Sequence, residues 1–296
     1  MKKVLAKFTS KLSRINVNDS DLPSSDNPNP VPIVLQEPTS IGLRVIHDPT
    51  DAKIDLIAIH GQNGHPINSW TDRNSGALWL RDLLPGILKT HLDVNVRVLT
   101  YGYAALEPVE TIGIRLMKSI AELRNETNSE GRKIIWCAHS FGGPLLQAAI
   151  GLVSPSRDIQ TSTNAFLFFG VAKNMGLDAL GTVLALPEAT LSDEMRELRK
   201  GMLWLKMGGE GFERLCEYLG WKIVWFREVG DKEDTIRDLK CVDELGGKDK
   251  DADGKEDTVV RLEKTHDAMI KFASAEDDDF KLVVKVAWTV FQRAVR

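Results

Sequence analysis

The feature that most constrains how this chain folds is a serine at the end of an apolar run. Residues 133–138 predict a buried strand, and residues 144–150 predict the helix that follows it. Ser140 stands on the turn between them, with Ala138 and Gly142 two residues to either side. Only small residues at those two positions let strand and helix approach closely, as the nucleophile elbow G-x-S-x-G requires. The segment therefore predicts a strained turn that presents a serine hydroxyl, and Ala138 departs from the pattern by one methyl group.

A second motif lies upstream of the elbow. Residues 54–59 predict a short apolar strand, and residues 60–66 form a glycine-punctuated loop after it. A loop in this place supplies one backbone N–H of an oxyanion hole, and the residue after the nucleophile supplies the other. We therefore expect the two donors to be Gln62 and Phe141, and a plain tight turn with an incidental histidine is the alternative.

The general base is predicted by elimination among six histidines. His266 follows a predicted strand over residues 258–263 and comes late in the chain, which matches the order nucleophile, acid, histidine. His139 adjoins the serine and cannot fold back onto it. The other four lie in the oxyanion loop, before an Asp-Pro turn or at the end of an amphipathic helix: His60, His65, His47 and His91. The base is therefore assigned to His266.

The acid that orients this histidine is expected at the end of the preceding strand, residues 221–227. Three carboxylates compete for the role. Glu228 stands at the tip of the strand, Asp231 follows a glycine in a turn, and Asp234 is further out. Spacing alone cannot choose among them, so Glu228 is favoured and Asp231 remains the alternative.

Several stretches together resemble lipase-like serine esterases. This family includes the serine-active-site proteins of phosphatidylglycerol remodelling and the esterase-type domains at the head of many fungal NOD-like receptors. The likeness spans about residues 40–295 and rests, besides the elbow, on residues 59–66, Trp70, residues 79–85, residues 101–103 and residues 266–272.

The resemblance implies an α/β-hydrolase fold, with a mostly parallel sheet and helices on both faces. It also implies that the acid is Glu228, because the family carries a glutamate at the same strand end. One segment departs from the family: residues 170–176 lack the proline and histidine of its G-T-P-H-x-G stretch.

Alternating strand and helix patterns favour one α/β domain over residues 40–296. Residues 177–219 differ, because they read as helices inserted before the strand that leads to the acid. Such insertions often form a cap over the active site, and the methionines among them would suit an acyl pocket: Met195, Met202 and Met207. Ordinary helical core is the alternative for this stretch.

The first 39 residues precede the domain. Residues 1–18 are basic without acids and place apolar residues near one helical face. A disordered basic tail is favoured, and the alternative is a transit peptide or a helix that makes peripheral contact with a membrane. Residues 19–38, rich in Ser, Asp, Asn and Pro, predict a linker that cannot pack a core.

Charge and cysteine content narrow the class of protein. A net charge of -4 lacks the positive excess that attracts the phosphates of nucleic acid. No apolar run approaches the roughly 20 residues of a membrane span. The odd set of three cysteines favours a reducing compartment. We therefore expect an intracellular, cytoplasmic protein, with a mitochondrial or membrane-associated one as the alternative.

One stretch partly matches a calcium-binding sequence motif. Residues 249–254 match the first half of an EF-hand loop, yet Val260 stands at position twelve, where a bidentate glutamate is needed, and Glu256 replaces the hydrophobic eighth residue. The sequence therefore predicts a charged loop there, and neither a metal nor a cofactor.

These residues predict a serine hydrolase that acts on carboxylic esters, in which Ser140 attacks, His266 transfers the proton and Glu228 holds the imidazole. The substrate is expected to be a small or lipid-like ester, and hydrolysis is not distinguished from acyl transfer. The alternative is a signalling or interaction module that keeps the hydrolase fold with vestigial or partner-dependent activity, since fold alone does not decide function. The sequence makes no prediction of oligomeric state.

Overall fold

The structure, a computed structural model, describes residues 40–153, 157–172, 187–188, 191–229, 247–250 and 256–295. The predicted N-terminal segment and linker, residues 1–39, lie outside this description, as do the alternative acid Asp231 and Asp234. Most of the calcium-like stretch, residues 249–254, is outside it as well. Residues Thr39–Arg296 form one compact unit by their internal contacts.

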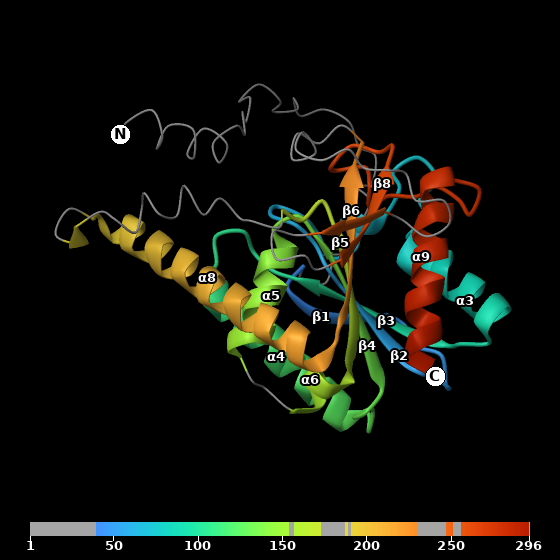
Figure 1. Cartoon of the computed structure of the whole chain (residues 1–296), viewed down its shortest axis with the longest axis horizontal. Coiled ribbons are helices and arrows are strands. Elements are labelled where there is room, and N and C mark those ends of the chain that lie inside the picture. The colour runs from blue at the N-terminus through green and yellow to red at the C-terminus, as the bar shows by residue number, and fades with distance from the viewer. Residues whose placement is uncertain are drawn as a thin grey trace, which may run out of the picture. The chain divides into compact units, whose positions relative to one another are not determined.

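An eight-stranded sheet organises the chain, in the order β1-β3-β2-β4-β5-β6-β8-β7 (Figure 1). The outer strands β1 and β7 pair antiparallel with their neighbours, and every other pair is parallel. The mostly parallel sheet expected from the sequence is therefore confirmed. The strands are β1 Gly42–His47, β2 Ile54–Ile59, β3 Val96–Gly102, β4 Lys133–His139, β5 Thr163–Phe169, β6 Lys222–Glu228, β7 Gly247–Lys250 and β8 Glu256–Leu262.

Helices cover both faces of this sheet, as Figure 1 shows. One face packs against α4 (Val109–Glu126), α5 (Gly142–Leu152), α6 (Arg157–Ser162) and α8 (Asp193–Leu219). The other packs against α3 (Leu84–Leu92) and α9 (Asp278–Val295), with the short η1 (Asn68–Trp70) and α2 (Trp79–Asp82) beside them. Strand β2 is buried along its whole length, so its side chains pack into the hydrophobic cores on both faces of the sheet. Ile54 and Leu56 lie in the core beside α3 and α9, and Ile57 and Ile59 lie in the core beside α4 and α5.

A buried ion network joins the elements at the amino-terminal end of β2. Both Asp55 oxygens accept hydrogen bonds from Arg97 on β3, at 2.8 and 2.9 Å, and Arg124 of α4 donates to the same carboxylate at 2.6 Å. Arg132 adds a bond at 3.1 Å, and Arg124 also reaches Asp158 of α6 at 2.7 Å. Asp55, Arg97 and Arg124 are each 1% exposed. This network lies at the opposite end of the strand from the predicted oxyanion loop.

Within the described part of the region predicted as an inserted cap, residues 187–188 and 191–219, the long helix α8 is the main element. Its second half packs on α5, where Gly208 and Gly211 face Gly151 and let the two helices approach closely. Met207 is 56% exposed, whereas Met195 and Met202 are half-buried. Much of residues 177–192 lies outside the described chain, so the cap and its acyl pocket stay predictions. No helix among the described residues is long and apolar enough to cross a lipid bilayer.

Candidate active site

Ser140 occupies the turn between β4 and α5. Its φ of 50° lies in the left-handed region, which costs a non-glycine residue energy and persists only where the surrounding structure enforces it. Two backbone bonds hold it, from Ser140 N–H to Phe169 O at 2.9 Å and from Gly143 N–H to Ser140 O at 3.0 Å. A Cβ on Gly142 would lie 2.4 Å from the carbonyl oxygen of His60, so that position accepts only glycine. The segment thus forms the strained strand-to-helix turn that its sequence predicts.

The glycine-rich loop after β2 lies against the serine. A Cβ on Gly61 would stand 3.0 Å from Ser140 Cβ, which places this loop in van der Waals contact with the serine predicted as the nucleophile. Among the residues that the structure describes, neither the Gln62 N–H nor the Phe141 N–H donates a hydrogen bond. Two unused backbone donors that flank a serine are what an oxyanion hole needs.

His60 fixes the start of that loop, a role that the sequence did not reveal. Its ring is 1% exposed and stacks on Tyr103, with ring centroids 4.4 Å apart and an interplanar angle of 8°. Burial lowers the pKa of His60 to about 4, so the ring is neutral at pH 7. Its Nδ1–H then donates to Gly61 O at 2.7 Å, and its Nε2 accepts the Tyr103 N–H at 3.4 Å. The Tyr103 hydroxyl also donates to His60 O at 2.9 Å, so Tyr103 holds both the ring and the backbone of His60.

His266 lies just beyond β8, in the turn that follows Leu262. Its ring packs over Gly170, where a Cβ would come within 2.8 Å of the imidazole. His139 donates from Nε2 to the His266 carbonyl at 2.9 Å, and the two rings lie 4.9 Å apart between centroids. Since Ser140 bonds Phe169 and His266 packs on Gly170, both side chains approach the same end of β5. Within the described chain no hydrogen bond joins the Ser140 hydroxyl to the His266 ring; such bonds often tighten only when substrate binds.

The carboxylate partner of His266 is not decided by the contacts. Glu228 is the last residue of β6 and pairs with Leu262, so it ends at the same edge of the sheet as β8. No hydrogen bond or ion pair of Glu228 exists within the described residues. Asp267 is a further carboxylate near His266: ligand atoms of Asp267, His139 and His266 all lie within 4.8 Å of one another.

That trio could also hold a metal ion, because two imidazoles and a carboxylate suit a zinc site. A cation bound there would occupy the imidazole of His266, which could then no longer take a proton from Ser140. The arrangement therefore fits a base or a metal ligand, but not both at once.

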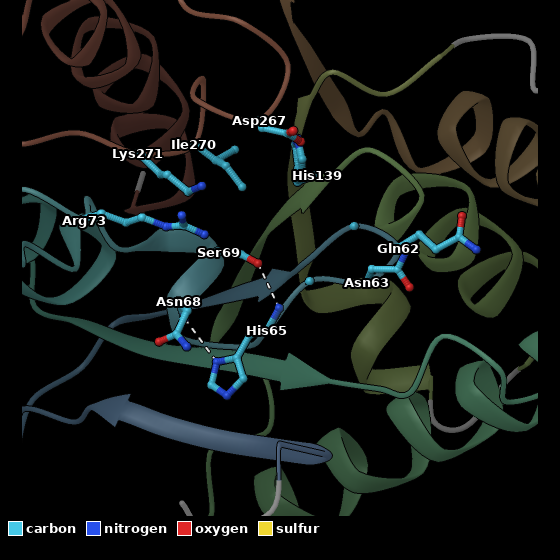
Figure 2. A pocket seen from close by; sticks show the side chains of 12 residues that line it. Gln62, Asn63, His65, Asn68, Ser69, Arg73, His139, Asp267, Ile270 and Lys271 are labelled. Atoms are coloured by element: carbon cyan, nitrogen blue, oxygen red, sulfur yellow. Dashed lines mark hydrogen bonds between the residues drawn. The ribbon is translucent and has the colours of Figure 1, made fainter. Parts of the chain in front are cut away.

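A cavity of about 330 Å³ opens between the oxyanion loop and the turn after His266 (Figure 2). The loop contributes residues 61–65 and η1 contributes Asn68 and Ser69. The remaining walls come from three segments: Arg73, His139, and Asp267 with Ile270 and Lys271. Its lining is mostly polar, and it shares Gly61 and Gln62 with the predicted oxyanion hole.

The arrangement of these elements decides the fold. The serine follows β4 at the centre of the sheet, Glu228 ends β6, and the histidine follows β8, which is the order nucleophile, acid, histidine on a mostly parallel sheet. The chain has the α/β-hydrolase fold. Its relation to the phosphatidylglycerol-remodelling branch and to the receptor domains stays a prediction.

No protein-family model matches the chain, and no curated protein matches it. Solved structures of similar shape include a metagenome-derived lipolytic enzyme at 13% identity, with 86% of this chain and 98% of that chain covered and a TM-score of 0.47. The thioesterase domain from the curacin biosynthetic pathway is 12% identical, with 83% and 94% covered and a TM-score of 0.42. A lipase of Bacillus licheniformis is 17% identical, with 65% and 74% covered and a TM-score of 0.38. Likenesses this distant carry no argument about activity.

Proposed function

We propose that this α/β-hydrolase-fold protein is a serine hydrolase that cleaves carboxylic esters. One observation carries the proposal: Ser140 holds a φ of 50° on the turn between β4 and α5, next to two backbone N–H groups that donate no hydrogen bond within the described chain. Backbone strain at a serine is retained where it serves a reaction, and an unused pair of donors beside it suits a developing oxyanion.

The reaction proceeds in two halves. Ser140 Oγ attacks the ester carbonyl carbon while His266 takes the serine proton, and the N–H groups of Gln62 and Phe141 stabilise the oxyanion of the tetrahedral intermediate. His266 then gives its proton to the leaving alkoxide. Water, activated by the same imidazole, attacks the acyl-serine and releases the acid. Each oxyanion donor contributes on the order of 3 kcal/mol to the stability of the transition state.

A carboxylate is needed to hold the imidazole and to stabilise its charged form. We assign this role to Glu228, on the support of its place at the end of β6 beside the strand that leads to His266. Asp231 is the alternative. The substrate is proposed to be a lipid-like ester, on the support of the family resemblance and the methionines of α8, and an alcohol in place of water would make the protein a transacylase.

The test is turnover of p-nitrophenyl butyrate by purified protein. Ser140→Ala and His266→Ala are each expected to lower kcat by about 10⁴-fold or more, because serine is a weak nucleophile without its base. Glu228→Gln is expected to lower kcat far more than Asp231→Asn, since only the residue bonded to the imidazole fixes its tautomer. His47→Ala, at the end of β1 and remote from the elbow in the chain, is the matched control and should turn over like the wild type.

Near wild-type turnover by His266→Ala would remove that residue from the reaction. The reverse ranking of the acids would transfer the role to Asp231. A folded wild type without turnover on any ester would favour an interaction module that has kept the hydrolase fold.

A further inference from the structure

Two cations line the cavity beside the oxyanion loop, and neither has a carboxylate partner within the described part of the chain. They are Arg73 and Lys271. In Figure 2 both side chains point toward the space enclosed by the labelled residues. Arg73 is exposed and Lys271 is half-buried, so water reaches both. An anion bound between two cations that converge on one pocket would receive charge-assisted hydrogen bonds from both.

Each cation is held in place by its own segment. Arg73 lies in a turn that Asp72 closes by accepting the N–H groups of Asn74 and Ser75, at 3.1 and 2.8 Å. The carboxylate next to Arg73 in the chain is therefore already engaged. Lys271 follows Ile270, whose carbonyl accepts the buried indole N–H of Trp79 at 2.9 Å. The two positive charges thus stand on anchored backbone rather than on loose loops.

The other groups that face the cavity complete a site for an oxyanion. Ser69 Oγ accepts the His65 N–H at 2.9 Å, which leaves its own proton for another acceptor. Asp267 is the one carboxylate among the lining residues, and it lies beside His139, within 4.8 Å of that imidazole. Two cations and one carboxylate leave a formal charge of +1 in the cavity, and a hydroxyl donor lies in the same wall as the oxyanion loop.

The cavity lies beside the proposed reaction site, although Ser140, Phe141 and His266 do not themselves line it. Gly61 and Gln62 form one of its walls, and Gly61 lies against Ser140. An ester bound at Ser140 would therefore have to extend past Gly61 and Gln62 to place a charged group in the cavity. Anion binding here would orient the ester for attack and would contribute to specificity.

We propose that this cavity binds a carboxylate or phosphate group of the ester substrate, with Arg73, Lys271 and Ser69 as its donors. The proposal rests on the proposed ester hydrolysis and adds the class of substrate: an ester that carries an oxyanion a few bonds from the cleaved linkage. Charged hydrogen bonds of this kind are the strong ones, and each cation adds about tenfold to the preference for the anionic ester.

The experiment compares matched esters that differ in one charge. p-Nitrophenyl hemiglutarate against p-nitrophenyl pentanoate tests a carboxylate on the acyl side, and butyryl glycerophosphate against monobutyrin tests a phosphate on the alcohol side. For each pair the readout is the ratio of kcat/KM, anionic over neutral. We expect one pair to give a ratio well above one in the wild type, and Arg73→Gln and Lys271→Gln each to lower that ratio by about tenfold. Lys271→Arg should restore most of it.

Lys118→Gln is the control, because Lys118 lies on α4 with a side chain 73% exposed and its removal subtracts the same charge. It should leave the ratio within about twofold of the wild type, as remote surface changes do.

Isothermal titration of the Ser140→Ala protein with glutarate and with glycerophosphate measures anion binding without turnover. Binding that weakens in the Lys271→Gln background supports the pocket even if no ester is cleaved, in which case only the proposed activity fails. Ester cleavage with equal rates for charged and neutral esters, and no anion binding, overturns the pocket and leaves the activity standing.

Discussion

Three histidines meet at the carboxyl edge of the sheet, and their surroundings give them different chemistry. Both ring nitrogens of His60 form hydrogen bonds with backbone groups, and His139 Nε2 donates a hydrogen bond to the His266 carbonyl. The ring of His266 makes no hydrogen bond within the described chain, so it alone keeps both nitrogens for proton transfer. Position in the chain is what led the sequence to predict His266 as the base, and that role stays a prediction. The hydrogen bonds of His60 and His139 could not be predicted from the sequence, because only the fold brings Tyr103 next to His60 and the His266 carbonyl next to His139.

His139 should make stability depend on pH. Burial lowers its pKa from 6.5 to about 4, so the unfolded chain binds more protons than the native one between these values. Stability is then fully present above the unfolded pKa and is lost as pH falls through 6.5 toward 4, by about 2 kcal/mol at pH 5 from this group. Urea unfolding of wild type and His139→Gln at pH 7 and pH 5 measures the difference. The variant, which can still donate to the His266 carbonyl but does not titrate, should lose less stability on acidification. An equal loss would mean that His139 is not the titrating group.

At the scale of the elements, apolar runs and turn residues predicted the strands and the elbow well, because each pattern is local. The buried network around Asp55 was not predicted. A carboxylate inside an apolar strand has no local partner, and its arginines come from β3, α4 and the approach to β4, 42 to 77 residues away. The same limit applies to α8, whose close contact with α5 depends on glycines of both helices.

Asp55 should be decisive for stability although it lies far from the elbow. Asp55→Asn leaves the buried guanidinium groups of Arg97 and Arg124 without their charge partner, and breaking a buried pair in this way costs about 3–5 kcal/mol. The free energy of unfolding in urea measures the loss. Asp93→Asn is the matched control, because Asp93 forms an exposed pair with Lys89 and Asn also tolerates its left-handed φ of 54°. Similar stability of both variants would contradict a structural role for the network.

At the scale of the whole molecule, the mostly parallel sheet and the place of Ser140 on the turn after β4 were predicted from the sequence, whereas the composition of the cavity was not. Arg73 and Lys271 lie almost two hundred residues apart in the chain, and only the fold brings them to one pocket. For a related reason, spacing in the sequence could not single out Glu228 as the acid. Glu228, Asp231 and Asp234 all follow the end of the same strand in the sequence. Contacts with the imidazole, rather than spacing along the chain, must select among them.

The central claim is that the strained Ser140 is a nucleophile. Its most direct test is mass spectrometry of the folded protein after treatment with a fluorophosphonate, which reacts covalently with activated serines. We expect a single adduct that forms stoichiometrically, maps to the peptide of Ser140, and is absent from Ser140→Ala and strongly slowed in His266→Ala. An unlabelled protein that circular dichroism shows to be folded, or an adduct on another residue, would contradict the account.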